Sequence, residues 1–119
     1  MGRYLHLQEK DLLRKMLSTV ATGEELLANL DLMLVEEMND GSMGGLIFKA
    51  QNRQARNLGN TIAEAEFLDE DGVLVTAMLN LDQQNALYEL DIWKVDFSPL
   101  KSWPDIETVT LKKKPETGQ

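Results

Sequence analysis

Carboxylate and tryptophan side chains recur at alternate positions in two strand-like parts of the chain, and their chemistry suits binding. Residues two apart in a β-strand share a face of the sheet, so these side chains are predicted to share its outward face. Carboxylates can receive Lys and Arg side chains from a partner, and an indole can anchor the contact. The predicted partner-binding residues are Glu64, Glu66, Glu89, Asp91 and Trp93.

Two structural interpretations explain the same face without a partner. It is either an ordinary solvated face or a second packing face in which Trp93 lies under helices. A divalent cation prefers oxygen ligands, but no histidine joins these carboxylates, and alternate strand positions are too regular to enclose an ion. We therefore predict no metal and no cofactor.

A glycine-dense loop, residues 40–45, has the sequence DGSMGG. It lacks the Lys-Ser/Thr ending of a phosphate-binding P-loop and is expected to join two strands, which favours a wide hairpin loop. Asp40 and Met43 are its candidate contact residues, because methionine adapts to varied surfaces. The alternative is a small-ligand or enzymatic pocket between helices and sheet, with this loop as its lid.

Other candidate motifs each lack a necessary residue. The segment 69–72, DEDG, resembles the opening of a calcium-binding loop, but Asn80 stands where the closing glutamate is required. His6 is the only histidine, and no serine lies in a nucleophile-elbow motif, so no catalytic residue is predicted. One basic cluster is too small for a nucleic-acid site, and it consists of Lys49, Arg53 and Arg56.

The charge balance favours a basic partner. The chain has 119 residues, a formal net charge of −8 and no cysteine, and residues 60–100 hold nine carboxylates against one cation, Lys94. Such a surface repels nucleic acid and anionic membranes and attracts basic proteins. The lack of cysteine and of a long apolar run predicts a cytoplasmic protein that does not enter the membrane.

Hydrophobic spacing predicts helices near the N-terminus. Apolar residues recur at helical intervals in 8–17. A capping-box pattern at 22–25 predicts a second, short helix. Strands are expected over 31–38 and 45–50, whereas 51–60 is compatible with a loop or with one helical turn.

Three strands between residues 61 and 96 are predicted to form a meander. A two-residue Asp71-Gly72 turn would put glutamates on the apolar face, whereas a three-residue loop with Gly72 in the left-handed conformation separates the faces. The second register pairs Phe67 with Val75, Ala65 with Ala77 and Ala63 with Leu79. In the third strand the residues expected to face the core are Tyr88, Leu90 and Ile92, with Leu87 facing outward.

These elements indicate a single α+β domain over residues 1–111, with N-terminal helices packed on an antiparallel meander sheet of about five strands. Its last edge strand is expected at 107–111. Residues 112–119 are expected to form a flexible C-terminal tail.

Residues 87–100 read LYELDIWKVDFSPL, which resembles a signature of a family of small bacterial proteins classed as a domain of unknown function. The DG-S/G-MG loop and the D-x-DG-V turn of that family are similar to residues 40–44 and 69–73. The family has no assigned activity, so the resemblance implies kinship without a function. Within the signature, Lys94 stands between two aspartates, Asp91 and Asp96, which favours a structural ion-pair network.

Three functional hypotheses follow. The first is a non-catalytic acidic interaction module that binds a basic protein, as inhibitors and immunity proteins bind toxic nuclease domains. The second is the small-ligand or enzymatic domain with a pocket near the 40–45 loop. The third is a structural subunit that forms a homodimer through the edge strand near Val109.

Overall fold

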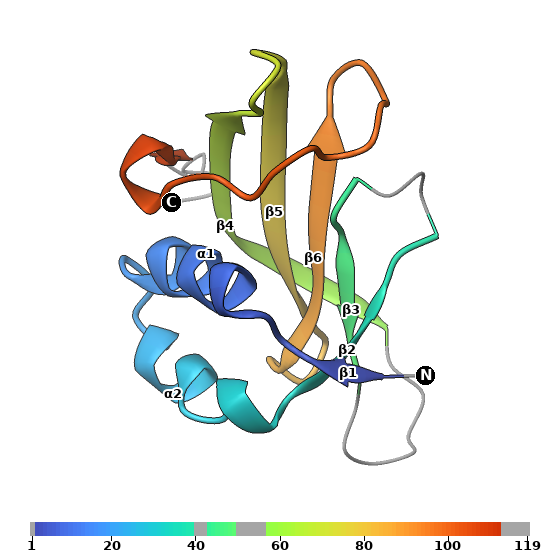
Figure 1. The fold of residues 1–119 in the computed structure, drawn as a ribbon. Coiled ribbons are helices and arrows are strands. Elements are labelled where there is room, and N and C mark those ends of the chain that lie inside the picture. Colours follow the sequence, from blue (N-terminus) through green and yellow to red (C-terminus); the bar gives the residue numbers. More distant parts are fainter. Residues whose placement is uncertain (1, 40–42, 50–56, 113–119) are drawn as a thin grey trace.

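The structure is a computed structural model that describes residues 2–39, 43–49 and 57–112. Within these residues it is an α+β fold, in which α-helices lie against one side of a seven-stranded antiparallel sheet (Figure 1). The strand order is β1-β2-β3-β6-β5-β4-β7. The elements are β1 Arg3–Tyr4, α1 Leu7–Leu17, α2 Gly23–Leu27, the 3-10 helix η1 Leu30–Leu32, β2 Leu34–Glu37, β3 Leu46–Phe48, β4 Leu58–Leu68, β5 Leu74–Asp82, β6 Leu87–Lys94, the 3-10 helix η2 Ile106–Thr108 and β7 Thr110–Lys112.

The predicted fold class is confirmed, but the predicted number of strands, about five, is too low. Strand β1 has two residues, which is too short to display the alternation by which a strand is recognised. The expected strand at 107–111 is instead η2 followed by β7. Strand β7 includes Lys112, and the remainder of the predicted tail lies outside the described residues.

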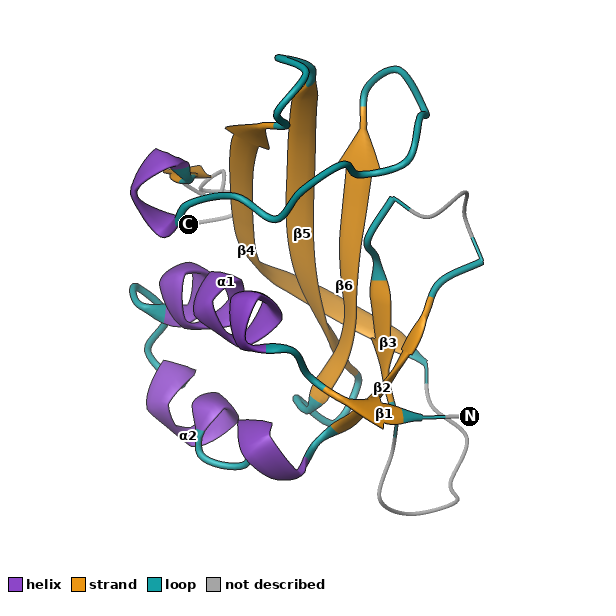
Figure 2. Ribbon diagram, in the orientation of Figure 1, coloured by secondary structure: helices purple, strands orange, loops and turns teal. Residues whose placement is uncertain are grey.

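Helix α1 matches the predicted helix at 8–17 and buries its apolar stripe. It packs against α2, β4 and η2, so the helices cover one face of the meander (Figure 2). Helix α2 is present, but the side chain of Thr22 makes no capping hydrogen bond, so the predicted capping box is wrong. The carboxylate that does cap a helix is Glu9, which accepts a hydrogen bond from the His6 backbone N–H at 2.8 Å. No helix within the described ranges is long and apolar enough to cross a membrane.

The β4–β5 hairpin has the predicted register. Its pairs include Phe67 with Val75, Ala65 with Ala77 and Ala63 with Leu79. Gly72 has a φ of 80°, in the left-handed region, and the Asp69 N–H donates to the Val73 carbonyl at 2.9 Å. The separation of an apolar face from a charged face therefore selects the three-residue loop, as the sequence predicts.

The core lies between this apolar face and the helices. Leu90 and Ile92 are buried as predicted, but Leu87 is buried too, and Tyr88 is only partly buried. A register shift between β5 and β6 after Asn80 resets the alternation at the start of β6 and turns Leu87 inward. The prediction that Leu87 faces outward is therefore wrong.

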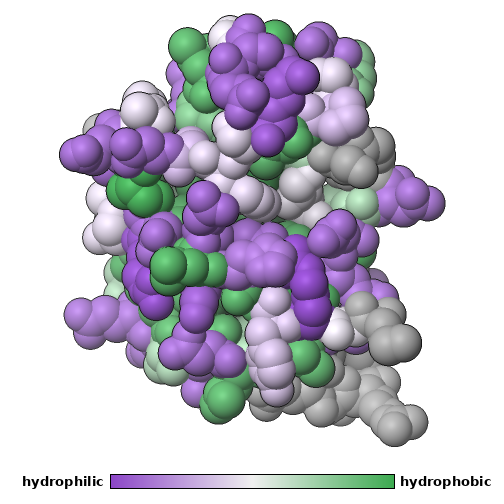
Figure 3. All heavy atoms as spheres, viewed as in Figure 1, coloured by the Kyte–Doolittle hydropathy of each residue, from purple (hydrophilic) through white to green (hydrophobic). Residues whose placement is uncertain are grey.

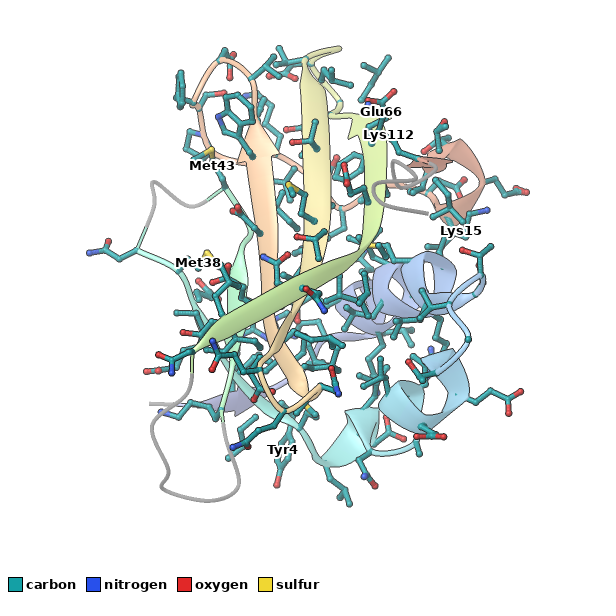
Figure 4. The ribbon with its side chains drawn as sticks, turned by 180° about the vertical axis from the view of Figure 1, so that it is seen from behind. Tyr4, Lys15, Met38, Met43, Glu66 and Lys112 are labelled. Atoms are coloured by element: carbon teal, nitrogen blue, oxygen red, sulfur yellow. The ribbon has the colours of Figure 1, made fainter. Side chains whose placement is uncertain are left out.

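Strand β4 bends in its first half. Its register against β5 shifts between Leu58 and Ala63, and a Cβ added at Gly59 would overlap the Asp82 carbonyl, so glycine permits the close approach. The bent half crosses β5 and β6 on the side away from the helices (Figure 1 and Figure 4). The undecided segment 51–60 therefore ends in strand, and residues 51–56 lie outside the described residues.

Candidate functional site

The sheet face opposite the helices carries most of the predicted partner-binding residues in two rows across β4, β5 and β6. The rows are Glu64–Met78–Asp91 and Glu66–Thr76–Trp93, and we call these six residues the acidic face. In Figure 4, which views this side, no helix crosses in front of β5 or β6. Trp93 is 44% exposed, so the interpretation that places it under the helices is wrong.

Glu89 lies on the same side of the sheet, in the row next to Glu64–Met78–Asp91. It pairs with Asn80, which is buried at the end of the sheet that β4 crosses. The Asn80 amide donates to Glu89 Oε1 at 3.0 Å, and Asn80 Oδ1 accepts from the Thr61 hydroxyl at 2.6 Å. The structure thus places all five predicted residues on the same face of the sheet, with Glu89 in a hydrogen-bond network that borders the two rows of the acidic face. In the part of the chain that the structure describes, no cluster of three or more potential metal ligands is arranged to hold an ion.

Glu66 has a partner on the neighbouring edge strand. Its Oε2 lies 3.6 Å from Lys112 Nζ, and the two side chains lie side by side in Figure 4. A half-exposed pair at this distance contributes little to stability. Lys112 therefore holds the partly exposed Glu66 carboxylate only weakly.

Lys94 is fully buried, because the alternation along β6 turns it to the face opposite Trp93. Its Nζ donates to Asp69 at 2.9 Å, to Asp71 at 2.7 Å and to the Pro99 carbonyl at 3.3 Å. We call Lys94, Asp69 and Asp71 the ion clamp. The predicted ion-pair network exists, but its carboxylates come from the β4–β5 loop and not from the two aspartates that flank Lys94 in sequence.

Asp69 connects three segments of the chain. Besides Lys94, it accepts backbone N–H groups of Glu70 at 2.7 Å, Lys101 at 2.8 Å and Ser102 at 3.1 Å. Burial alone would raise the pKa of Asp69, but the hydrogen bonds from Lys94 and these amides outweigh it and lower the pKa to about 2. The bonds to Asp69 and Asp71 likewise raise the pKa of Lys94 against the opposing effect of burial. Lys94 therefore stays charged, which suits a structural role and not a base or a nucleophile.

The ion clamp makes a pH dependence of stability predictable. The folded pKa of Asp69, about 2, lies below its ordinary value of 3.8, so the contribution of this carboxylate is complete above about pH 4 and is lost as the pH falls through about 2. We expect the free energy of unfolding to fall over this window more steeply in the wild type than in Asp69→Asn, whose side chain does not titrate. Urea denaturation at several pH values measures both slopes, and equal slopes would contradict the assignment.

All three motifs of the family resemblance meet at the ion clamp. The D-x-DG-V turn supplies Asp69 and Asp71, and the LYELDIWKVDFSPL segment supplies Lys94. Met43, from the glycine-dense loop, accepts a hydrogen bond from the Lys94 backbone N–H through its sulfur at 3.4 Å. Met43 is therefore half-buried against β6 (Figure 4), while the other predicted contact residue of this loop, Asp40, lies outside the described residues.

A half-open cleft of about 200 Å³ lies beside the glycine-dense loop, near the pocket that the second hypothesis predicts. Gly44 is one of its lining residues. Its φ is 102°, and a Cβ added there would lie 3.0 Å from the Leu100 side chain. Ligand pockets usually measure roughly 300 to 1,000 Å³, so this cleft of about 200 Å³ is smaller than a usual ligand pocket. Other lining residues are Arg3, His6, Glu9, Glu37 and Trp103.

The polar groups of the cleft bond to one another. Arg3 donates to the two oxygens of Glu9 at 2.9 and 2.8 Å, to Glu37 at 3.3 and 3.2 Å and to the Tyr4 carbonyl at 3.1 Å. Burial alone would raise the pKa of Glu9, but the bonds from Arg3 and from the His6 backbone lower it. The sequence does not reveal the bonds of Arg3 to Glu9 and Glu37, because Arg3 lies in a strand of only two residues. The one available signal is Glu9 itself, which stands at the third position of the helix that follows His6, where a carboxylate can cap the helix.

Comparison with protein families assigns the chain to a family. The family model described as Domain of unknown function (DUF6984) matches residues 2–104, which include the acidic face, the ion clamp and the lining of the cleft. The chain belongs to the DUF6984 family. No curated protein and no solved structure matches it significantly. The elements η2 and β7 follow the segment matched by DUF6984.

Proposed function

We propose that the protein is a non-catalytic interaction module whose acidic face binds a basic protein. One observation carries the proposal: Trp93 is 44% exposed among carboxylates that β4 and β6 bring to the same side of the sheet. Aromatic side chains are enriched at the centres of protein interfaces, where burial yields much of the binding energy. Inhibitors and immunity proteins that cap basic enzyme domains are the class that this arrangement fits best.

The charge of the chain supports the same proposal. The formal net charge is −8, and residues 60–100, which contain the acidic face, hold nine carboxylates against one cation. That cation, Lys94, is buried in the ion clamp. A surface of one sign accelerates the encounter with a partner of the opposite sign, and salt weakens this effect.

A charge reversal tests the proposal. In Glu64→Lys/Asp91→Lys both changes flank Met78 on the acidic face. The control, Glu24→Lys/Glu25→Lys, makes the same change of charge on α2, on the helical side, where hydrophilic and hydrophobic residues are interspersed (Figure 3). We expect a basic protein captured from cell extract by the wild type to bind the face variant at least about tenfold more weakly and the control with nearly wild-type affinity.

The affinity of the captured protein is then measured by calorimetry at rising salt. Steep weakening between about 50 mM and about 500 mM salt is the expected result for contacts between exposed charges. Equal loss of affinity in the face variant and the control would show a response to net charge alone. That outcome, or salt-insensitive binding, would contradict the proposal.

The cleft supports a second candidate, binding of a small ligand. The supporting observations are its position beside the glycine-dense loop and its indole wall, Trp103. The cleft is a weaker candidate than the acidic face, because it is small and because Arg3, Glu9 and Glu37 already bond to one another. The third hypothesis, a homodimer through the edge near Val109, stays a prediction that light scattering would test directly.

A further inference from the structure

The acidic face ends in exposed apolar residues. Trp93 is followed on the same face by Val95, which is 42% exposed and whose N–H donates to the Leu74 carbonyl at 3.0 Å. Leu74 in turn pairs with Leu68, which is 62% exposed. The Phe97 ring lies 5.8 Å from the Trp93 ring, centroid to centroid, and is tilted by 48°. We call these five residues, Leu68, Leu74, Trp93, Val95 and Phe97, the apolar cluster.

Phe97 is held in a conformation that its side chain disfavours. Its φ is 64°, and a residue other than glycine pays about 1 kcal/mol or more for this left-handed conformation. The turn is fixed by the Phe97 N–H, which donates to the Lys94 carbonyl at 2.8 Å, and by the bond from Lys94 to Pro99. Phe97 is nevertheless 67% exposed, so packing in the core does not offset the strain. The strained backbone thus holds an aromatic ring beside Trp93 in solvent, and no burial of that ring offsets its energetic cost.

The apolar cluster and the carboxylates are close enough for one partner segment to cover both. Asp91 lies two residues before Trp93 along β6 and four residues before Val95, which corresponds to about 7 Å and about 14 Å in a strand. A segment with an apolar anchor over the cluster would therefore carry its cations within this range. An exposed apolar cluster bordered by charge is typical of an interaction site.

We propose that the apolar cluster receives an aromatic or aliphatic anchor of the basic partner, while the carboxylates beside it receive Lys or Arg from the same segment. The proposal rests on the proposed function and adds the chemistry of the segment that is recognised. Phe97 is then part of the recognition surface, and the ion clamp positions it. Its strain is retained because an unstrained turn would not present the ring next to Trp93.

A library of random dodecapeptides selected against the immobilised wild-type protein tests this proposal. We expect enriched peptides to combine Lys or Arg with Trp, Phe, Leu or Ile. Their affinities are then measured by fluorescence anisotropy for the wild type, Phe97→Asn and Trp93→Ala. Asparagine adopts the left-handed conformation more readily than phenylalanine, so we expect Phe97→Asn to keep or raise the melting temperature while it weakens peptide binding at least about tenfold.

The outcomes separate this inference from the proposed function. Basic peptides that bind Phe97→Asn as tightly as the wild type but bind Trp93→Ala more weakly would overturn the apolar cluster as the anchor site and leave the proposed function, which rests on Trp93 and the carboxylates, intact. Basic peptides that bind both variants as tightly as the wild type would overturn both proposals. Failure to enrich basic peptides above those found with an unrelated protein would overturn both. A fall in the melting temperature of Phe97→Asn would overturn the positioning of Phe97 for recognition, because the ring would then serve the fold.

Discussion

Asp69→Ala is expected to destabilise the protein by about 3 kcal/mol or more, because it leaves a buried cation and buried amides without their acceptor. Lys94 would keep Asp71 as its one carboxylate, and the N–H groups of Lys101 and Ser102 would lose their acceptor. Removal of one partner from a buried ion pair costs more than the pair contributes. Urea denaturation followed by far-ultraviolet circular dichroism measures the loss.

Lys94→Met is the matched comparison for Asp69→Ala. Methionine keeps most of the apolar stem of the lysine, so the core loses little packing. Asp69 would still accept the backbone N–H groups of Glu70, Lys101 and Ser102, and the Asp71 side chain is 26% exposed and can turn toward water. We expect a smaller loss of stability than in Asp69→Ala, and the reverse order would mean that Lys94, and not Asp69, connects the three segments.

Gly44→Val is expected to cost about 3 kcal/mol, since strain and overpacking act together. Gly44 has a φ of 102°, where a branched side chain is strongly disfavoured. An added Cβ would also lie 3.0 Å from Leu100 and 3.6 Å from Ile92 and Trp103, so the cleft wall would have to move. Thermal unfolding of the variant measures the combined cost.

Gly72→Val supplies the control for the Gly44 prediction. Gly72 has a similar positive φ of 80°, but an added Cβ would meet nothing within 4 Å. We therefore expect the free energy of unfolding of Gly72→Val to fall only by the cost of the backbone strain, about 1 to 2 kcal/mol. If both variants lose the same stability, Gly44 is required for its backbone conformation alone, and the proposed packing against Leu100 and Trp103 is wrong.

Features of this fold that depend on neighbouring residues could be predicted from the sequence. The register of the β4–β5 hairpin follows from the alternation around Glu64 and Glu66 and from Gly72. The same alternation correctly predicts that Glu64, Glu66, Asp91 and Trp93 share a face. A side chain's direction along a regular strand has a period of two, so a few residues suffice to determine it.

Features that depend on distant or irregular contacts could not be predicted. The register shift that turns Leu87 into the core leaves no mark in the order of residues. The sequence suggests Asp91 and Asp96 as partners of Lys94, but Asp91 points to the other face and Asp96 follows the strand. The pairing of β4, β5 and β6 instead brings Asp69 to Lys94. Strand β1 pairs with β2 about thirty residues later in sequence, and two residues carry no recognisable pattern.

Both edges of the sheet are very short strands, and this has a consequence for the behaviour of the protein in concentrated solution. Strand β4 has eleven residues, and a bare edge of that length would offer unpaired N–H and carbonyl groups to other chains. Strand β7 covers it opposite Glu64, Ala65 and Glu66, and it ends in the charged Lys112. Buried Val109 anchors β7 to the core. Strand β7, which follows the segment matched by DUF6984, therefore keeps Glu64, Ala65 and Glu66 of β4 paired, and its shortness and its lysine disfavour intermolecular strand pairing at this edge.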